Sequence, residues 1–226
     1  MTMPISLTPS EKRTGLVYLA FNLLFLPLLI SLTGAALALD TAQVNIIYYM
    51  VNFAAVLWIF RKFLRGNLLV ALDRVFPVLW YAALAYLGQE TIGELLNALI
   101  YSINPAYINQ NDATVANLVL RNPFFGFCVV TVVPIAEETL YRGLVFRGLY
   151  DRSPMAAYLV SMAVFSAIHV TAYIGRVSPL HLALSFVQYL PAAYCLCFAY
   201  RRSGTILSPI FVHMAINAIG VFGLMR

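Results

Sequence analysis

The fold is decided by the stretch of residues 123–146, which reads PFFGFCVVTVVPIAEETLYRGLVF. A helix that crosses a bilayer needs ~20 mostly apolar residues, and this stretch is long enough. It nevertheless contains three charged residues, Glu137, Glu138 and Arg142. Because ionisable groups are costly inside a membrane, they mark a functional site by default. The stretch therefore predicts both a transmembrane helix and a polar site within it.

The composition of the whole chain points the same way. Of its 226 residues, 62% are hydrophobic and only 10% are charged, whereas soluble domains carry roughly 25% charged residues. Lipid must therefore cover much of the surface, so the bilayer is an expected partner. The net charge of +5 is small for a nucleic-acid binder, and no nucleic-acid partner is expected. The three cysteines, Cys128, Cys195 and Cys197, lie in apolar runs without disulfide-framework or zinc-site spacing.

Apolar segments of spanning length recur along the chain. They predict an all-α fold, a polytopic membrane helical bundle of about seven transmembrane helices, with residues 1–226 forming a single transmembrane domain. The seven segments are approximately 14–39, 43–60, 68–88, 123–146, 154–173, 179–200 and 205–225. The polar residues 101–122 are expected to form the longest loop.

The third and the first of these segments contain features that are unusual for a transmembrane helix. Asp73 and Arg74 interrupt the start of the third, whose first turns are therefore expected to lie along the membrane interface. The first contains Ala36-Leu37-Ala38, which looks like a signal-peptidase site. Its apolar run is longer than the ~7–15 residues of a signal peptide's hydrophobic region, so we interpret it as a retained helix.

The positive charges predict an orientation. Ten Lys and Arg residues flank the spans on the side of the N-terminus, and three lie on the opposite side. Because cytoplasmic loops carry the excess of Lys and Arg, the N-terminus is expected in the cytoplasm.

Polar residues occur in three of the predicted spans at helical spacing. Glu138 and Arg142 are four residues apart and lie on one helix face, so they can pair. Glu137 is rotated from Glu138 by ~100° and points elsewhere. His169 lies four residues after Phe165, and Asn217 lies four residues after His213, each pair in its own span.

Glu137, His169 and His213 all fall near the middle of their spans, so neighbouring helices can bring them together at one depth. A carboxylate can take a proton from water while an imidazole orients that water. A second imidazole and an amide can stabilise an oxyanion. The set therefore favours hydrolysis by activated water. Ser161 and Ser166 lie near His169 but lack nucleophile-elbow glycines.

Three motifs together resemble a known family. They are Glu137-Glu138-Thr-Leu-Tyr-Arg142, Phe165-Ser-Ala-Ile-His169 and His213-Met-Ala-Ile-Asn217. Their order and their placement in separate spans resemble the CAAX proteases and bacteriocin-processing enzymes, also called the Abi or type II prenyl endopeptidase family. The resemblance covers residues ~123–225, where the catalytic motifs lie, and the preceding ~120 residues match only as hydrophobic helices.

The resemblance implies an intramembrane glutamic endopeptidase. By it, Glu137 and His169 activate water, His213 and Asn217 form the oxyanion site, and Glu138 and Arg142 are a supporting ion pair. It implies a membrane-anchored peptide or protein substrate, either a prenylated tail or a leader-type precursor. It also implies a multi-pass location in a bacterial plasma membrane. No cofactor or metal is expected, and no oligomeric state is predicted.

Three alternatives stay open at this stage. The first is a catalytically silent immunity or scaffold protein of the membrane. The second is a transporter or proton relay that uses Glu137 and the histidines, although no inverted repeat is evident in the sequence. The third is a zinc-dependent membrane protease, whose ligands would have to come from Glu137, His169 and His213 because His-Glu-x-x-His is absent.

Overall fold

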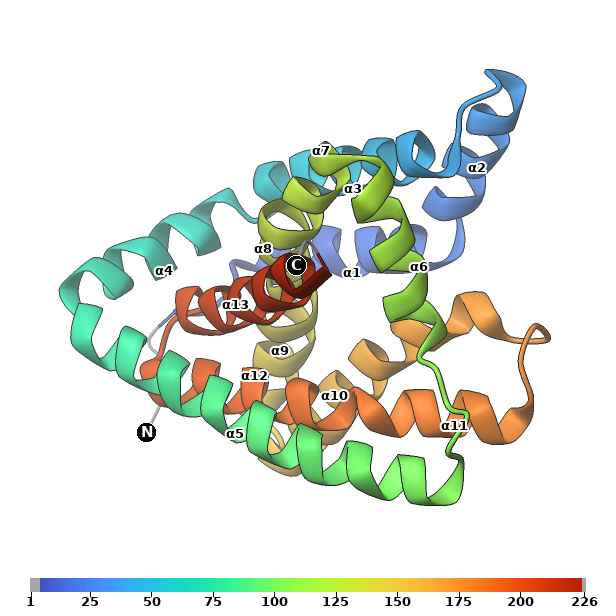
Figure 1. Ribbon diagram of the computed structural model, residues 1–226. Coiled ribbons are helices and arrows are strands. Elements are labelled where there is room, and N and C mark those ends of the chain that lie inside the picture. Colours follow the sequence, from blue (N-terminus) through green and yellow to red (C-terminus); the bar gives the residue numbers. More distant parts are fainter. Residues whose placement is uncertain (1–4, 225–226) are drawn as a thin grey trace.

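The computed structural model describes residues 5–224, and every regular element within that range is a helix. Figure 1 shows the helices packed as one bundle. The all-α membrane fold expected from the sequence is confirmed. The elements are α1 Pro9–Leu24, α2 Leu26–Ala36, α3 Thr41–Ile59, α4 Arg61–Asp73, α5 Val75–Ile103, α6 Gln110–Arg121, α7 Pro123–Phe127, η1 Cys128–Val132, α8 Val133–Glu138, η2 Thr139–Phe146, α9 Arg147–Tyr150, α10 Pro154–Val170, η3 Thr171–Tyr173, α11 Pro179–Gln188, α12 Leu190–Ser203 and α13 Leu207–Leu224.

The central element is the continuous helical stretch Pro123–Tyr150, made of α7, η1, α8, η2 and α9. Its apolar window is 61% buried, more than in any of the other three long apolar helices, because other helices surround it. In Figure 1 it runs through the middle of the bundle. Helices α3 and α13 pack against α8, and α10 and α12 pack against η2.

The described helices include several candidate membrane spans, to be compared with the seven predicted from the sequence. Four of the described helices are long and apolar enough to span a membrane, or up to six when each bent helix pair counts as one span. Helix α13 contributes a shorter apolar stretch, Leu207–Gly223. Large apolar side chains such as Trp58, Phe76 and Leu95 are 69%, 76% and 70% exposed on the outer surface. A bilayer provides the apolar surroundings that such a surface needs, and the protein is an integral membrane protein.

The third predicted span has its boundary in the wrong place. The segment 68–88 does not form one straight helix, because the chain bends by 99° between α4 and α5. The bend falls where Asp73 ends α4 and Arg74 separates it from α5, at the two charges that interrupt the apolar run. The full-length helix is α5, which continues as far as Ile103.

The loop expected over residues 101–122 is also wrong. Within it, α6 begins after Asn109, whose side chain accepts hydrogen bonds from the backbone N–H groups of Asn111 and Asp112. Asparagine is among the preferred N-cap residues because it satisfies such unpaired donors. Val119 is buried on one side of α6 while Leu120 is 62% exposed. The polar composition here marks a short amphipathic helix, not a loop.

Candidate active site

Two adjacent glutamates on α8 define the site. The helix is short, and π-helical segments flank it, η1 before it and η2 after it. Pro134 lies just after the junction of η1 and α8, inside the continuous helical stretch, and has no N–H to donate to the preceding turn. Segments of π-helix inside α-helices frequently occur at functional sites. Glu137 and Glu138 point in different directions from this helix and have different surroundings.

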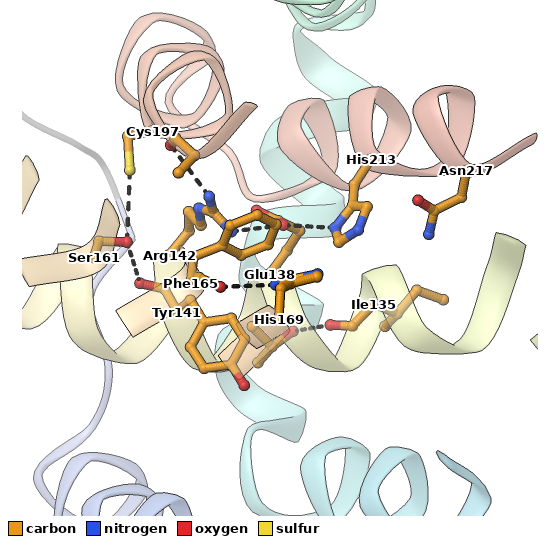
Figure 2. A network of polar contacts seen from close by, with 12 residues as sticks. Ile135, Glu138, Tyr141, Arg142, Ser161, Phe165, His169, Cys197, His213 and Asn217 are labelled. Carbon is orange, nitrogen blue, oxygen red and sulfur yellow. Dashed lines mark hydrogen bonds and ion pairs between the residues drawn. The ribbon is translucent and has the colours of Figure 1, made fainter. Parts of the chain in front are cut away.

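Glu138 is completely buried and has two partners (Figure 2). Its Oε1 accepts a hydrogen bond from Arg142 Nη1 at 2.9 Å, so the pair expected from the sequence forms. The same oxygen lies 2.9 Å from Nδ1 of His213 on α13. The sequence did not predict this second contact, because spacing within one helix says nothing about a residue 75 positions away.

Arg142 is held from three sides. Its Nη2 donates to the backbone oxygen of Ala193 at 3.1 Å. Its guanidinium carbon lies 4.2 Å from the ring centroid of Phe165, a distance within the ~6 Å range of cation–π contacts. Arg142 is 0% exposed, so its charge depends on these groups and on Glu138 for compensation.

Glu137 faces a cavity of about 780 Å³. Glu137 Oε2 is buried and has no hydrogen-bond partner among the described residues. The cavity brings together all four residues predicted to be catalytic, Glu137, His169, His213 and Asn217, from α8, α10 and α13. Neither Glu138 nor Arg142 lines it.

His169 has a defined orientation. Its Nδ1 lies 2.7 Å from the backbone oxygen of Phe165. A carbonyl oxygen can only accept, so Nδ1 carries the hydrogen and Nε2 of the neutral ring is an acceptor. The ring centroid is 4.6 Å from that of Phe165 and 4.4 Å from that of Tyr189. The two rings therefore restrict rotation of the imidazole.

His213 and Asn217 lie one turn apart on α13 (Figure 2). The His213 ring meets the edge of Phe165 at a centroid distance of 5.7 Å, so both histidines contact the same aromatic ring. Because Nδ1 of His213 faces the Glu138 carboxylate, Nε2 is the remaining ring nitrogen. The amide of Asn217 donates one hydrogen to the backbone oxygen of Val129 at 2.8 Å.

Ser161 and the three cysteines lie outside the cavity. Ser161 donates to the backbone oxygen of Tyr141 at 3.0 Å, and Cys197 donates to Ser161 at 3.6 Å. None of the three cysteines lines the cavity. Over residues 5–224, no three His, Cys, Asp or Glu side chains are grouped in a way that could hold a metal ion.

The cavity also contains residues that sequence reasoning did not single out. Eleven of them are amides or tyrosines, all but Tyr141 from outside the three motifs: Asn22, Asn45, Tyr48, Tyr49, Gln89, Asn97, Asn109, Asn111, Tyr141, Gln188 and Tyr189. Polar residues in apolar helices were the available signal. The sequence alone could not assign these residues to one cavity, because that depends on how the helices pack.

The part of the chain that carries the three motifs is similar to a known family. Residues 119–219 match the family described as type II CAAX prenyl endopeptidase Rce1-like, and this range holds every motif residue. The resemblance predicted from the motifs is thereby confirmed.

One similar curated protein is named "Putative membrane peptidase YdiL", from Bacillus subtilis (strain 168). The two are 24% identical over 145 residues, which cover 64% of this chain and 55% of that protein. The matched region thus spans little more than half of the relative's length. No solved structure is significantly similar to this chain.

Proposed function

We propose that this protein is an intramembrane endopeptidase that hydrolyses a peptide bond with water activated by Glu137. One observation carries the proposal: Glu137, His169, His213 and Asn217 come from three separate helices and line one cavity inside a membrane protein. The Rce1-like match and the similarity to a named membrane peptidase support it.

In the proposed first step, Glu137 takes a proton from water as the water oxygen bonds to the carbonyl carbon of the substrate. The acceptor Nε2 of His169 orients the second hydrogen of that water. The carbonyl oxygen becomes an oxyanion, which the free N–H of Asn217 and Nε2 of His213 stabilise. Glu137 then returns its proton to the amide nitrogen while the C–N bond breaks, which yields a carboxylic acid and an amine.

The hydrogen bond to Glu138 restricts how His213 can act. Nδ1 of His213 donates to Glu138, so Nε2 can donate to an oxyanion only if the ring is an imidazolium. In that form, Glu137 and Glu138 carry two negative charges and Arg142 and His213 carry two positive charges. When Glu137 becomes protonated, the oxyanion replaces its charge. The site stays neutral overall, which favours the step in a medium of low dielectric constant.

We propose a substrate that is anchored to the membrane, either a prenylated C-terminal tail, as the family description suggests, or a leader-type precursor, as the motif resemblance implies. The catalytic unit is residues 123–225 of a single transmembrane domain. We further propose a bacterial plasma membrane location with a cytoplasmic N-terminus, from the excess of Lys and Arg on that side.

The test compares membranes of cells that express the protein with membranes of cells that express Glu137→Gln. Peptides are sequenced by mass spectrometry, and new C-termini and released fragments are recorded. We expect fragments that depend on the unsubstituted protein and reappear when it is purified and mixed with the uncleaved substrate in vesicles. Identical peptide sets from two equally abundant, folded proteins would support the silent scaffold instead.

A further inference from the structure

Two aromatic rings contact His169, and their importance rests on the proposed function, in which His169 orients the reacting water. Phe165 precedes it by one turn of α10, with an interplanar angle of 45°. Tyr189 contacts the imidazole with an interplanar angle of 32° and comes from the junction of α11 and α12. Tyr189 is therefore the contact that a different part of the chain supplies.

The hydroxyl group of Tyr189 is anchored at the start of α6. It lies 2.8 Å from Oδ1 of Asp112 and 3.2 Å from Oδ1 of Asn109, either of which can accept its hydrogen. It accepts a hydrogen bond from Asn111 Nδ2 at 3.1 Å. These three residues are the N-cap and first turn of α6. The ring of Tyr189 is thus fixed at its hydroxyl end and packs on His169.

The preceding residue strengthens this junction. Gln188 Oε1 accepts hydrogen bonds from Tyr107 and from Asn109, each at 2.7 Å. Its Nε2 donates to Asn97 on α5 at 2.9 Å. The segment that carries Tyr189 is therefore connected to both α5 and α6, and its position is defined by several side chains.

The restraint matters because the imidazole torsion is soft. The χ2 angle of histidine has broad minima, so one hydrogen bond from Nδ1 to Phe165 leaves the ring some freedom. A proton-transfer group misplaced by ~1 Å can cost ~10²-fold in rate. We infer that Tyr189, held by the first turn of α6, is a positioning residue that keeps Nε2 of His169 directed at the reacting water.

The test uses two substitutions of Tyr189 on the purified protein in vesicles. Tyr189→Leu removes the stacked ring, and we expect kcat to fall about 10–100-fold with little change in KM, since substrate binding is not the function lost. Tyr189→Phe keeps the ring but loses the hydroxyl anchor, so its loss is expected to be smaller. Tyr194→Leu is the matched control, because Tyr194 lies on the same helix, is 45% exposed and does not line the cavity.

The anchor is tested through Asp112. We expect Asp112→Ala to lower kcat by no more than Tyr189→Phe does, because the latter also removes the contacts of the hydroxyl with Asn109 and Asn111. The double variant is expected to be no worse than Tyr189→Phe, because the hydrogen bond to Asp112 is lost in both single variants. Asp112→Asn keeps an acceptor oxygen and is expected to restore most of the rate. Additive losses, or an equal loss in Asp112→Asn, would overturn the anchoring role.

A second readout does not depend on catalysis. The chain has three histidines, so the imidazole NMR signals of labelled protein can be assigned by single substitutions. We expect Tyr189→Leu to shift and broaden the His169 signal while the signal of His181, which stacks on Tyr107 at 4.8 Å, stays in place. An unchanged His169 signal would overturn the inference. A shifted signal in a protein that cleaves nothing would instead count against the proposed function alone.

Discussion

The two neighbouring glutamates of α8 have the same chemistry and opposite surroundings. Glu138 is enclosed by Arg142, His213 and the surrounding helices and lines no cavity. Glu137 faces a cavity of about 780 Å³ and forms no ion pair among the described residues. A carboxylate that is held ionised by an ion pair is a weak base. The side of the helix that each glutamate occupies, more than the residue type, is therefore the basis on which we propose a structural role for Glu138 and a reactive role for Glu137.

Substitution of Glu137 is expected to have the largest effect on cleavage. Glu137→Gln keeps the shape of the side chain but cannot accept the proton, and general bases contribute roughly 10²–10⁴-fold to rate. We expect cleavage to fall by at least this factor while membrane abundance and melting temperature stay near normal. Both quantities are measured in one preparation. A Glu137→Gln protein with near-normal specific activity would show that the base was assigned to the wrong glutamate.

Glu138→Gln tests the other side of the comparison. It leaves the guanidinium of Arg142 buried without its counter-charge, and breaking such a pair costs roughly 3–5 kcal/mol. We expect the melting temperature and membrane abundance to fall at least as much as the activity per folded molecule. A stable but inactive Glu138→Gln protein would contradict the structural role.

A double variant separates stability from chemistry. Replacing a buried ion pair by apolar residues is often neutral for stability, so Glu138→Leu with Arg142→Met is expected to recover much of the melting temperature lost in Glu138→Gln. Cleavage is not expected to recover, because Nδ1 of His213 no longer has its carboxylate.

The oxyanion side of the cavity gives the next largest effect. Asn217→Ala removes a donor that acts on charge present only in the transition state, so kcat is expected to fall roughly 10²–10³-fold with KM unchanged. His213→Ala is expected to lower kcat in the same way. An unchanged kcat with a raised KM would make Asn217 a substrate-holding residue.

Phe165 is expected to have a smaller effect on stability. Its ring contacts the guanidinium of Arg142 and both histidines. Phe165→Leu keeps an apolar side chain but loses the cation–π contact, which is worth roughly 0.5–2 kcal/mol. A lowered melting temperature with a modest loss of kcat is the expected result. Equal losses from Phe222→Leu on the exposed surface of α13 would indicate that the effect is not specific.

No effect at all is expected from strong chelators, since water activated by Glu137 is the proposed nucleophile. The measurement is cleavage after incubation with chelator and removal of free ions. Loss of activity that added zinc restores would move the mechanism to the zinc alternative.

The sequence predicted what local spacing controls. Helical periodicity placed Glu138 and Arg142 on one face, and the structure forms that pair. Apolar length predicted α10 at its observed start, Pro154. Apolar length did not predict the 99° bend after α4, because the hydropathy of a segment does not indicate the direction in which its helix runs. The segment of α6 was assigned to a loop, because the polar face of this helix has the composition of a loop. The contacts between His213 and Glu138 and between Tyr189 and His169 depend on packing between distant helices, which spacing does not encode.

The π-helical segments affect which insertions and deletions this stretch of the chain tolerates. Hydrogen bonds in η1 and η2 join residues five positions apart, whereas those of an α-helix join residues four positions apart. Each segment therefore contains more residues in a turn than a regular α-helix does. Losing or gaining one residue between Cys128 and Phe146 would rotate the following helix by ~100°. Such a change would separate Glu138 from Arg142 or turn Glu137 away from the cavity. Between Cys128 and Phe146, insertions and deletions of a single residue are therefore expected to be tolerated less than most substitutions.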